Sequence, residues 1–117
     1  MKIRLFENSS DFVVFLAGHV LFKEGDPGDR MYAVIGGAVD MVVRGQVIET
    51  VEAGGIFGEM ALVEDQPRSA SAIVKTEAKL VSVDRNRFLF MVQQTPFFSL
   101  QLLGIVTARL RRLVERV

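Results

Sequence analysis

The stretch Phe57-Gly58-Glu59-Met60-Ala61-Leu62, followed after four residues by Pro67-Arg68-Ser69-Ala70, is the most informative part of this 117-residue chain. It places a glycine, a carboxylate and an arginine within eleven residues. Glycine lets a backbone approach a ligand closely, and the first amides of a helix offer hydrogen bonds to an anion. The planar guanidinium of Arg68 suits phosphate oxygens, whereas Glu59 only accepts hydrogen bonds and therefore suits a hydroxyl. The stretch predicts a site for a ligand that carries both groups.

The composition describes one domain without a pronounced charge. Apolar residues make up 50% of the chain, which is enough for a core at this length. The 14 Lys and Arg residues balance the 14 Asp and Glu residues, which argues against a free nucleic-acid-binding domain. The lack of cysteine excludes disulfides, thiolate metal sites and a cysteine nucleophile. The N-terminal apolar run Phe12–Ala17 is too short for a membrane span and lacks the basic start of a signal peptide, so we expect a cytoplasmic protein.

The first two thirds of the chain alternate between glycines and short apolar runs. Residues 38–43 alternate in the manner of a strand, and the runs Ala72–Val74 and Lys79–Val83 favour strands as well. The segment Gly25–Asp29 predicts a turn, because proline presets φ, glycine permits positive φ and aspartate can bond its own backbone. Short strands separated by regular turn signals predict a β-sandwich or barrel.

The last third of the chain predicts two helices. The first covers Arg85–Gln94, and the second runs to Val117 with Thr95 as N-cap and Pro96 in its first position. The second helix has two apolar stripes and therefore two surfaces to bury. One stripe comprises Leu103, Val106, Leu110, Leu113 and Val117; the other comprises Phe98, Leu102 and Ile105. The first stripe has coiled-coil spacing over only about two heptads, which leaves intramolecular packing and a dimer contact equally open.

At these residues the chain resembles the cyclic nucleotide-binding domain of catabolite activator proteins, kinase regulatory subunits and cyclic nucleotide-gated channels. The segment Ala17–Asp26 resembles the opening two strands of that domain, Met31–Val39 the following hairpin, and Phe57–Ala70 its phosphate-binding cassette. A lone F-G-E motif would be weak, whereas the full cassette at the expected distance from the glycine turns is specific. The resemblance covers nearly the whole chain.

The resemblance implies a single domain over residues 1–117 with a mainly β fold. Its body is an eight-stranded double-stranded β-helix, a jelly-roll-like β-roll over about 12–84, with a short helix in the cassette. Two C-terminal helices follow over about 85–117. The spacer Val63–Gln66 departs from many family members because it lacks glycine, and we expect its two carboxylates to point outward. The helix-turn-helix of the activators is absent, so we expect no DNA-binding domain.

The resemblance also implies roles for individual residues. Glu59 accepts the ribose 2′-hydroxyl, and Arg68 pairs with the cyclic phosphate. The phosphate cradle is completed by Gly58, Met60, Ala61, Ser69 and Ala70. The base pocket includes Met41 and Ile48, and the lid candidates on the last helix are Arg109, Arg112 and Arg116. In the family, threonine after the arginine goes with guanine preference, so Ser69 implies cAMP rather than cGMP as the favoured ligand.

The favoured function is a cyclic nucleotide-binding regulatory module whose C-terminal helices move on binding and change its contact with a protein effector. An alternative is a degenerate roll that has lost its nucleotide and acts as a dimerisation or interaction module through the last helix. In that case Glu59 and Arg68 are no more than surface ion-pairing residues. A β-barrel metalloenzyme needs two or more histidines with a carboxylate, and the chain has one histidine. We therefore expect no enzyme, metal or cofactor.

Overall fold

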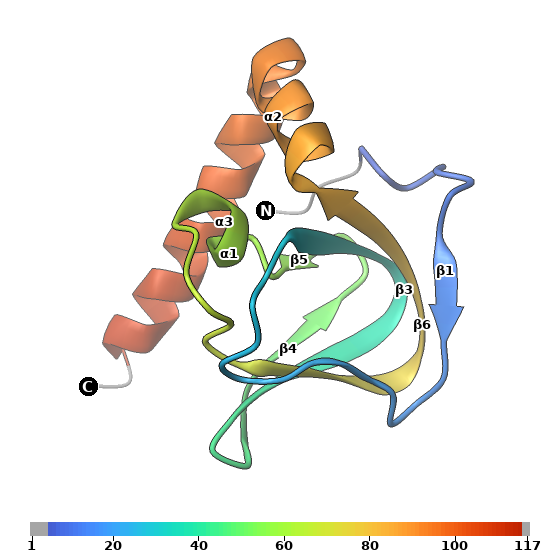
Figure 1. Cartoon of the computed structure of the whole chain (residues 1–117), viewed down its shortest axis with the longest axis vertical. Helices are drawn as coiled ribbons and strands as arrows, with labels where there is room; N and C mark the ends of the chain where they lie inside the picture. Colours follow the sequence, from blue (N-terminus) through green and yellow to red (C-terminus); the bar gives the residue numbers. More distant parts are fainter. Residues whose placement is uncertain (1–4, 116–117) are drawn as a thin grey trace.

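The computed structural model describes residues 5–115 and places six strands before two long helices (Figure 1). The elements in order are β1 (Val13–Phe15), β2 (Val20–Phe22), β3 (Arg30–Val43), β4 (Gln46–Glu52), β5 (Ile56–Phe57), α1 (Met60–Val63), β6 (Ser71–Asp84), α2 (Arg85–Gln94) and α3 (Pro96–Glu115). The described strand pairs are all antiparallel. Strand β6 is central, because it pairs with β1, β2 and β3, while β3 also pairs with β4 and β5.

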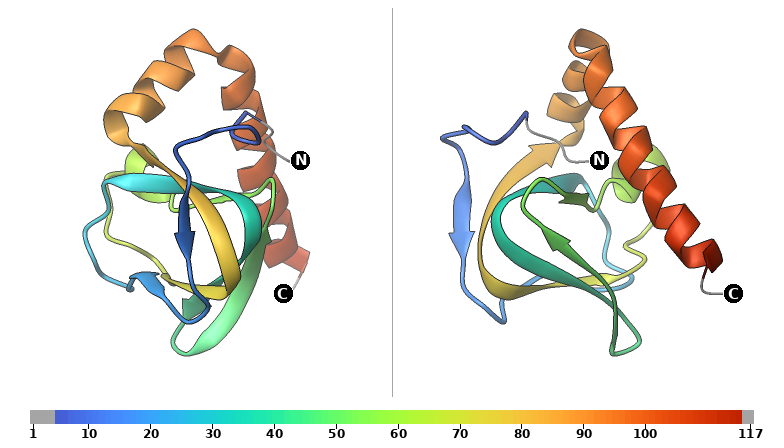
Figure 2. Two further views of the ribbon diagram at one scale, coloured as in Figure 1. Left: turned by 90° about the vertical axis from the view of Figure 1, so that its right-hand side faces the viewer. Right: turned by 180° about the vertical axis from the view of Figure 1, so that it is seen from behind.

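The strands curl into a roll, and the helices lie along one side of it. In Figure 1, α1 lies in front of α3 beside the roll, and Figure 1 and the right-hand view of Figure 2 show α3 on the side opposite β1. This arrangement brings the cassette around α1 under the long C-terminal helix.

The predicted count of eight strands is wrong for the described residues, because β3 and β6 are each continuous over 14 residues. The segment Met31–Val39, expected to be a hairpin, lies inside β3. The pair Gly36-Gly37 shifts the register between β3 and β6 and does not end either strand. A bulge of this kind bends and twists a strand without ending it. One bent strand therefore occupies the place where two short strands were predicted. The two apolar runs before residue 84 likewise both belong to β6.

Two apolar clusters form the core. One lies inside the roll and includes Val39, Phe57 and Leu80. The other joins the roll to the helices and comprises Phe6, Met31, Ala33, Ile56, Leu62, Val81, Val83, Phe88, Met91, Phe98, Leu102 and Ile105. The stripe Phe98, Leu102 and Ile105 of α3 is therefore buried, which accounts for one of the two surfaces that α3 was predicted to bury. The first stripe is exposed, with Leu103 and Leu110 each at 60%, and its last member Val117 lies outside the described residues.

The bounds of α2 and the start of α3 agree with the sequence, whereas the predicted end of α3 at Val117 lies outside the described residues. Helix α2 spans Arg85–Gln94 and α3 begins at Pro96, both as predicted. Asp84 precedes α2 in an extended conformation, and its carboxylate accepts a hydrogen bond from the Arg87 amide at 2.8 Å. No single helix within residues 5–115 has the length and apolar character to cross a membrane, whereas α2 and α3 pass that test only as a pair bent by 112°.

The Asp84 cap predicts a measurable loss of stability on substitution. Asp84→Ala should lower the free energy of unfolding by about 1 kcal/mol, because the Arg87 amide loses its acceptor. Urea denaturation measures this change. Asp84→Asn keeps a side-chain oxygen and should retain most of the stability; an equal loss in both variants would contradict the cap.

Candidate functional site

A cavity of about 470 Å³ lies between the cassette, β4 and α3. Its size is within the range of small-molecule sites. The structure brings together around it every predicted site residue that it describes, namely Met41, Ile48, Gly58, Glu59, Met60, Ala61, Arg68, Ser69, Ala70, Arg109 and Arg112. The remaining lid candidate, Arg116, lies outside the described residues. The lining also includes residues that the sequence did not single out for the site, namely Phe22, Glu49, Phe57, Pro67, Val106, Leu110 and Leu113.

The predicted turn at Gly25–Asp29 holds the backbone of Arg68. The Gly25 amide donates to the Arg68 carbonyl at 2.8 Å, and the Arg68 amide donates to the Asp26 carbonyl at 2.8 Å. The Asp26 carboxylate accepts from the Lys23 amide at 2.9 Å, so this aspartate bonds the backbone just before the predicted turn. Strand β2, just before the turn, places the Phe22 ring 4.0 Å from Cζ of Arg68.

The Arg68 guanidinium is buried beside carbonyl oxygens rather than carboxylates. It is 7% exposed and donates to the carbonyls of Gly58 at 3.0 Å and Arg30 at 2.8 Å. Burial lowers the pKa of this guanidinium. Among residues 5–115, its Nε is the one buried side-chain nitrogen or oxygen without a hydrogen-bond partner, and it forms no ion pair. A buried cation with neutral partners favours an anionic ligand.

Two glycines allow the chain to approach Arg68 this closely. Gly58 has a φ of +82°, and a Cβ there would lie 2.8 Å from Nη1 of Arg68. At Gly28, a Cβ would lie 2.5 Å from Cβ of Ala61 and 2.8 Å from Nε of Arg68. The predicted turn therefore packs directly against both the arginine and the short helix of the cassette.

Adding a methyl group at position 28 should disturb this packing. We expect Gly28→Ala to destabilise the protein by about 1–3 kcal/mol through overpacking, and to weaken ligand binding because Arg68 must shift. Gly36→Ala is the matched control, since its Cβ would meet Lys79 at an ordinary 3.7 Å. Thermal unfolding and ligand titration compare the two variants. A Gly28 variant that behaves like the Gly36 variant would show that the close approach has no energetic consequence.

The amino-acid sequence matches a known protein family. A family model for the cyclic nucleotide-binding domain matches residues 12–95. The chain belongs to this family. This cyclic nucleotide-binding domain is 36% identical over 105 residues to the CRP-like cAMP-activated global transcriptional regulator of Mycobacterium tuberculosis, a match that covers 86% of the chain and 47% of the regulator. The chain thus spans about half the length of that relative.

Solved structures share the fold. The crystal structure of the Thermus thermophilus catabolite activator protein aligns with a TM-score of 0.78 at 27% identity, covering 92% of this chain and 54% of that one. A structure of PKAR CBD2 bound to Sp-2Cl-cAMPS aligns with a TM-score of 0.70 at 25% identity, covering 87% of this chain and 70% of that one. These similarities identify the roll with the β-roll of the family.

In this cyclic nucleotide-binding domain, Glu59 pairs with a residue of α3 and not with Arg68. Glu59 is 4% exposed, and its carboxylate accepts a hydrogen bond from Nη1 of Arg109. The Arg109 side chain also donates through Nη2 to the Ile56 carbonyl, and its Nε lies 2.9 Å from the Glu49 carboxylate. The Arg109 guanidinium therefore links α3 to Glu49 of β4, Ile56 of β5 and Glu59 of the cassette.

The role of Glu49 was missed in the sequence. Glu49 adjoins Ile48, which was assigned to the base pocket, but its partners Arg109 and Arg112 lie 60 and 63 positions later. Local patterns do not show such a pair. Three arginines of the last helix were equivalent candidates in the sequence; of the two that lie within residues 5–115, Arg109 contacts Glu59.

The glycine-free spacer is accommodated without blocking the cavity. Glu64 and Asp65 are exposed, as predicted. Asp65 takes a φ of +53°, a left-handed conformation that aspartate adopts more readily than most residues. The carboxylate of Asp65 lies 3.4 Å from Nη2 of Arg85 at the start of α2. The glycine-free spacer therefore adds no carboxylate to the cavity lining.

Proposed function

We propose that this domain is a regulatory module that binds a cyclic nucleotide, with cAMP favoured over cGMP, in the cavity between the cassette and α3. The observation that carries the proposal is the buried Arg68 guanidinium, whose partners are two carbonyls and an aromatic ring. A cyclic phosphate would supply the missing negative charge. The M. tuberculosis relative is named as cAMP-activated, which supports the same class of ligand.

The rest of the cavity fits the other parts of such a ligand. Glu59 is an acceptor for ribose hydroxyls, and the apolar side chains of Met41, Ile48 and Leu110 offer surface to a base. Ser69 lies at the cassette with its hydroxyl 3.9 Å from the Met60 sulfur. The serine supports the preference for cAMP through the family pattern of threonine with guanine.

Helix movement is the second part of the proposal. Helix α3 contributes Val106, Arg109, Leu110, Arg112 and Leu113 to the cavity, so a ligand that fills it contacts the helix directly. Any shift of α3 is limited by the difference in ligand affinity between its two positions. Contact with a protein effector would then depend on the nucleotide.

Isothermal titration calorimetry with cAMP, cGMP and 5′-AMP tests the binding. We expect cAMP to bind most tightly, cGMP more weakly, and 5′-AMP poorly because its open phosphate differs in shape and charge. At a hundredfold excess over the dissociation constant, cAMP should add about 2.7 kcal/mol of stability. Absence of heat and of thermal stabilisation with both cyclic nucleotides would overturn the proposal.

A dimerisation module without nucleotide is the second candidate, and the exposed stripe of α3 favours it. Leu103 is 60% exposed and lies outside the cavity lining, whereas Leu110 and Leu113 belong to that lining. Leu103→Asp therefore tests assembly without altering the ligand site. Light scattering should detect a dimer that this substitution breaks if the stripe is an interface; a monomer in both proteins would remove this candidate. Within residues 5–115, no group of three or more metal-ligating side chains gathers to suggest metal catalysis.

A further inference from the structure

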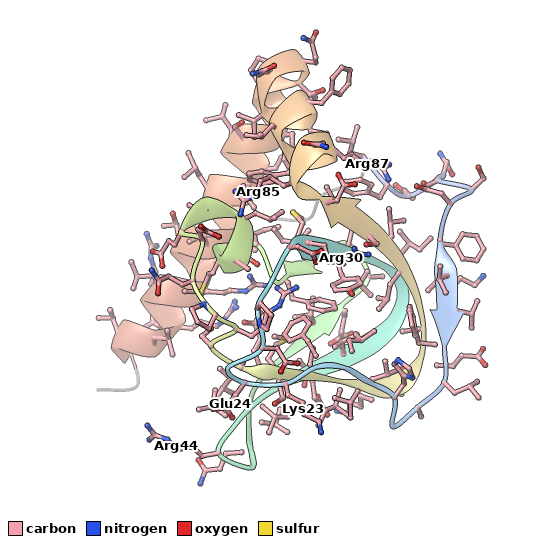
Figure 3. The ribbon with its side chains drawn as sticks, viewed as in Figure 1. Lys23, Glu24, Arg30, Arg44, Arg85 and Arg87 are labelled. Atoms are coloured by element: carbon pink, nitrogen blue, oxygen red, sulfur yellow. The ribbon has the colours of Figure 1, made fainter. Side chains whose placement is uncertain are left out.

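The first residue of α2 is bonded to α1. Arg85 donates through Nη1 to the Leu62 carbonyl at 3.2 Å and through Nη2 to the Ala61 carbonyl at 3.4 Å. Its Nη2 also lies 3.4 Å from the Asp65 carboxylate. Figure 3 labels Arg85 beside α1, with Arg87 of the same helix directed elsewhere. Arg85 does not line the cavity, so its contacts concern the cassette and not the ligand directly.

The carbonyl bonds, and not the ion pair, are the important part of this contact. Asp65 is 89% exposed, and an ion pair of that kind contributes little. Helix α1 is four residues long, has no basic residue in its last turn, and ends with carbonyls that lack helical partners. A cation at this end also interacts favourably with the negative end of the helix dipole. Arg85 therefore supplies from 23 positions later the cap that the sequence of α1 lacks.

The other end of α1 belongs to the ligand site. Glu59 stands at its N-cap position, and Met60 and Ala61 line the cavity. A four-residue helix is only about 6 Å long, so Ala61 belongs to the cavity wall while its carbonyl is held by Arg85. Leu62 packs in the same cluster as Phe88 of α2. Helices α1 and α2 are thus joined by the Arg85 hydrogen bonds and share one apolar cluster.

We propose that Arg85 is a positioning residue that couples the cassette to α2, so that a cyclic nucleotide bound at α1 sets the position of α2 and, through the bend at Thr95, of α3. This inference rests on the proposed function. It assigns the coupling to a contact separate from the pair between Arg109 and Glu59. A ligand that moves α1 changes the Arg85 contacts, which is the differential interaction that a population shift requires.

Pulsed electron paramagnetic resonance measures the coupling. The chain has no cysteine, so Thr76→Cys on β6 and Arg111→Cys on α3, both exposed, provide unique labelling positions. The distance between the two labels is recorded with and without saturating cAMP in this background and with Arg85→Gln or Arg85→Lys added. Calorimetry records the cAMP affinity of each protein. Arg87→Gln is the matched control, because Arg87 also lies in the first turn of α2 but pairs with Asp11 at 2.7 Å.

We expect cAMP to change the distance in the labelled parent and in the Arg87 variant. Arg85→Gln should still bind cAMP but lose the change in distance, and Arg85→Lys should lose most of it, since a lysine lacks the fork that reaches two carbonyls. A full change in both Arg85 variants would overturn the coupling, and so would a complete loss of binding, because Arg85 lies outside the cavity. Failure of the parent to bind cAMP would instead overturn the proposed function.

Discussion

Arg68→Gln is expected to abolish the stabilisation of the protein by cAMP at concentrations that saturate the wild type. Arg68 is 7% exposed and has no carboxylate partner in the described part of the chain, so the cyclic phosphate is its expected counter-charge. Truncating one partner of a buried charge pair costs about 2–5 kcal/mol, which corresponds to an affinity loss of about 30-fold or more. Calorimetry and thermal unfolding with a cAMP series measure this loss.

Arg30→Gln is the control for this substitution. Arg30 contributes its backbone carbonyl to Arg68 at 2.8 Å, while its own side chain is 43% exposed and pairs with Asp29. The variant therefore removes a neighbouring positive charge and leaves the Arg68 contacts in place. We expect it to bind cAMP within a few-fold of the wild type. Equal affinities of the Arg68 variant and the wild type would contradict the phosphate assignment.

The sequence was sufficient for the parts of the site that are local. The cassette, the turn at Gly25–Asp29 and the start of α3 at Pro96 are all specified by neighbouring residues. The strand count could not be predicted in the same way, because a glycine pair marks a turn and a bulge equally well. At Gly36-Gly37 the partner strand β6 determines the outcome, since pairing resumes on both sides of the pair. The distinction depends on a strand that begins 34 residues later.

The partner of Glu59 was also beyond local patterns. Glu59 and Arg109 are separated by 50 positions and meet only because α3 crosses the cassette. The spacing of apolar residues in α3 determines which face packs on the roll, and burial of Phe98, Leu102 and Ile105 turns Arg109 toward the cavity. The apolar stripe and the arginine could each be recognised in the sequence. That burial of the stripe places Arg109 at Glu59 could be seen only in the folded structure.

Arg109→Met should destabilise the ligand-free protein by about 3–5 kcal/mol, because it removes the cation from the 4% exposed Glu59. Arg112→Met is the matched control, since Arg112 lies one turn later, is 55% exposed and pairs with Glu49 at 3.3 Å. Its loss should cost about 0–1 kcal/mol. Urea denaturation without nucleotide compares the two. Adding Glu59→Gln to the Arg109 variant should recover part of the loss, because the buried negative charge is then removed.

The response of the Arg109 variant to ligand decides what Arg109 does in the binding cycle. If ribose hydroxyls replace the guanidinium at Glu59, then cAMP should stabilise Arg109→Met more than the wild type, because in the wild type the ligand must displace an existing pair. The analogue 2′-deoxy-cAMP lacks the hydroxyl assigned to Glu59 and should give no such gain. A smaller stabilisation of the variant by cAMP would contradict competition at Glu59 and would make Arg109 a residue that holds the ligand. The same titration thus separates a helix that competes for the ribose site from one that closes over the nucleotide.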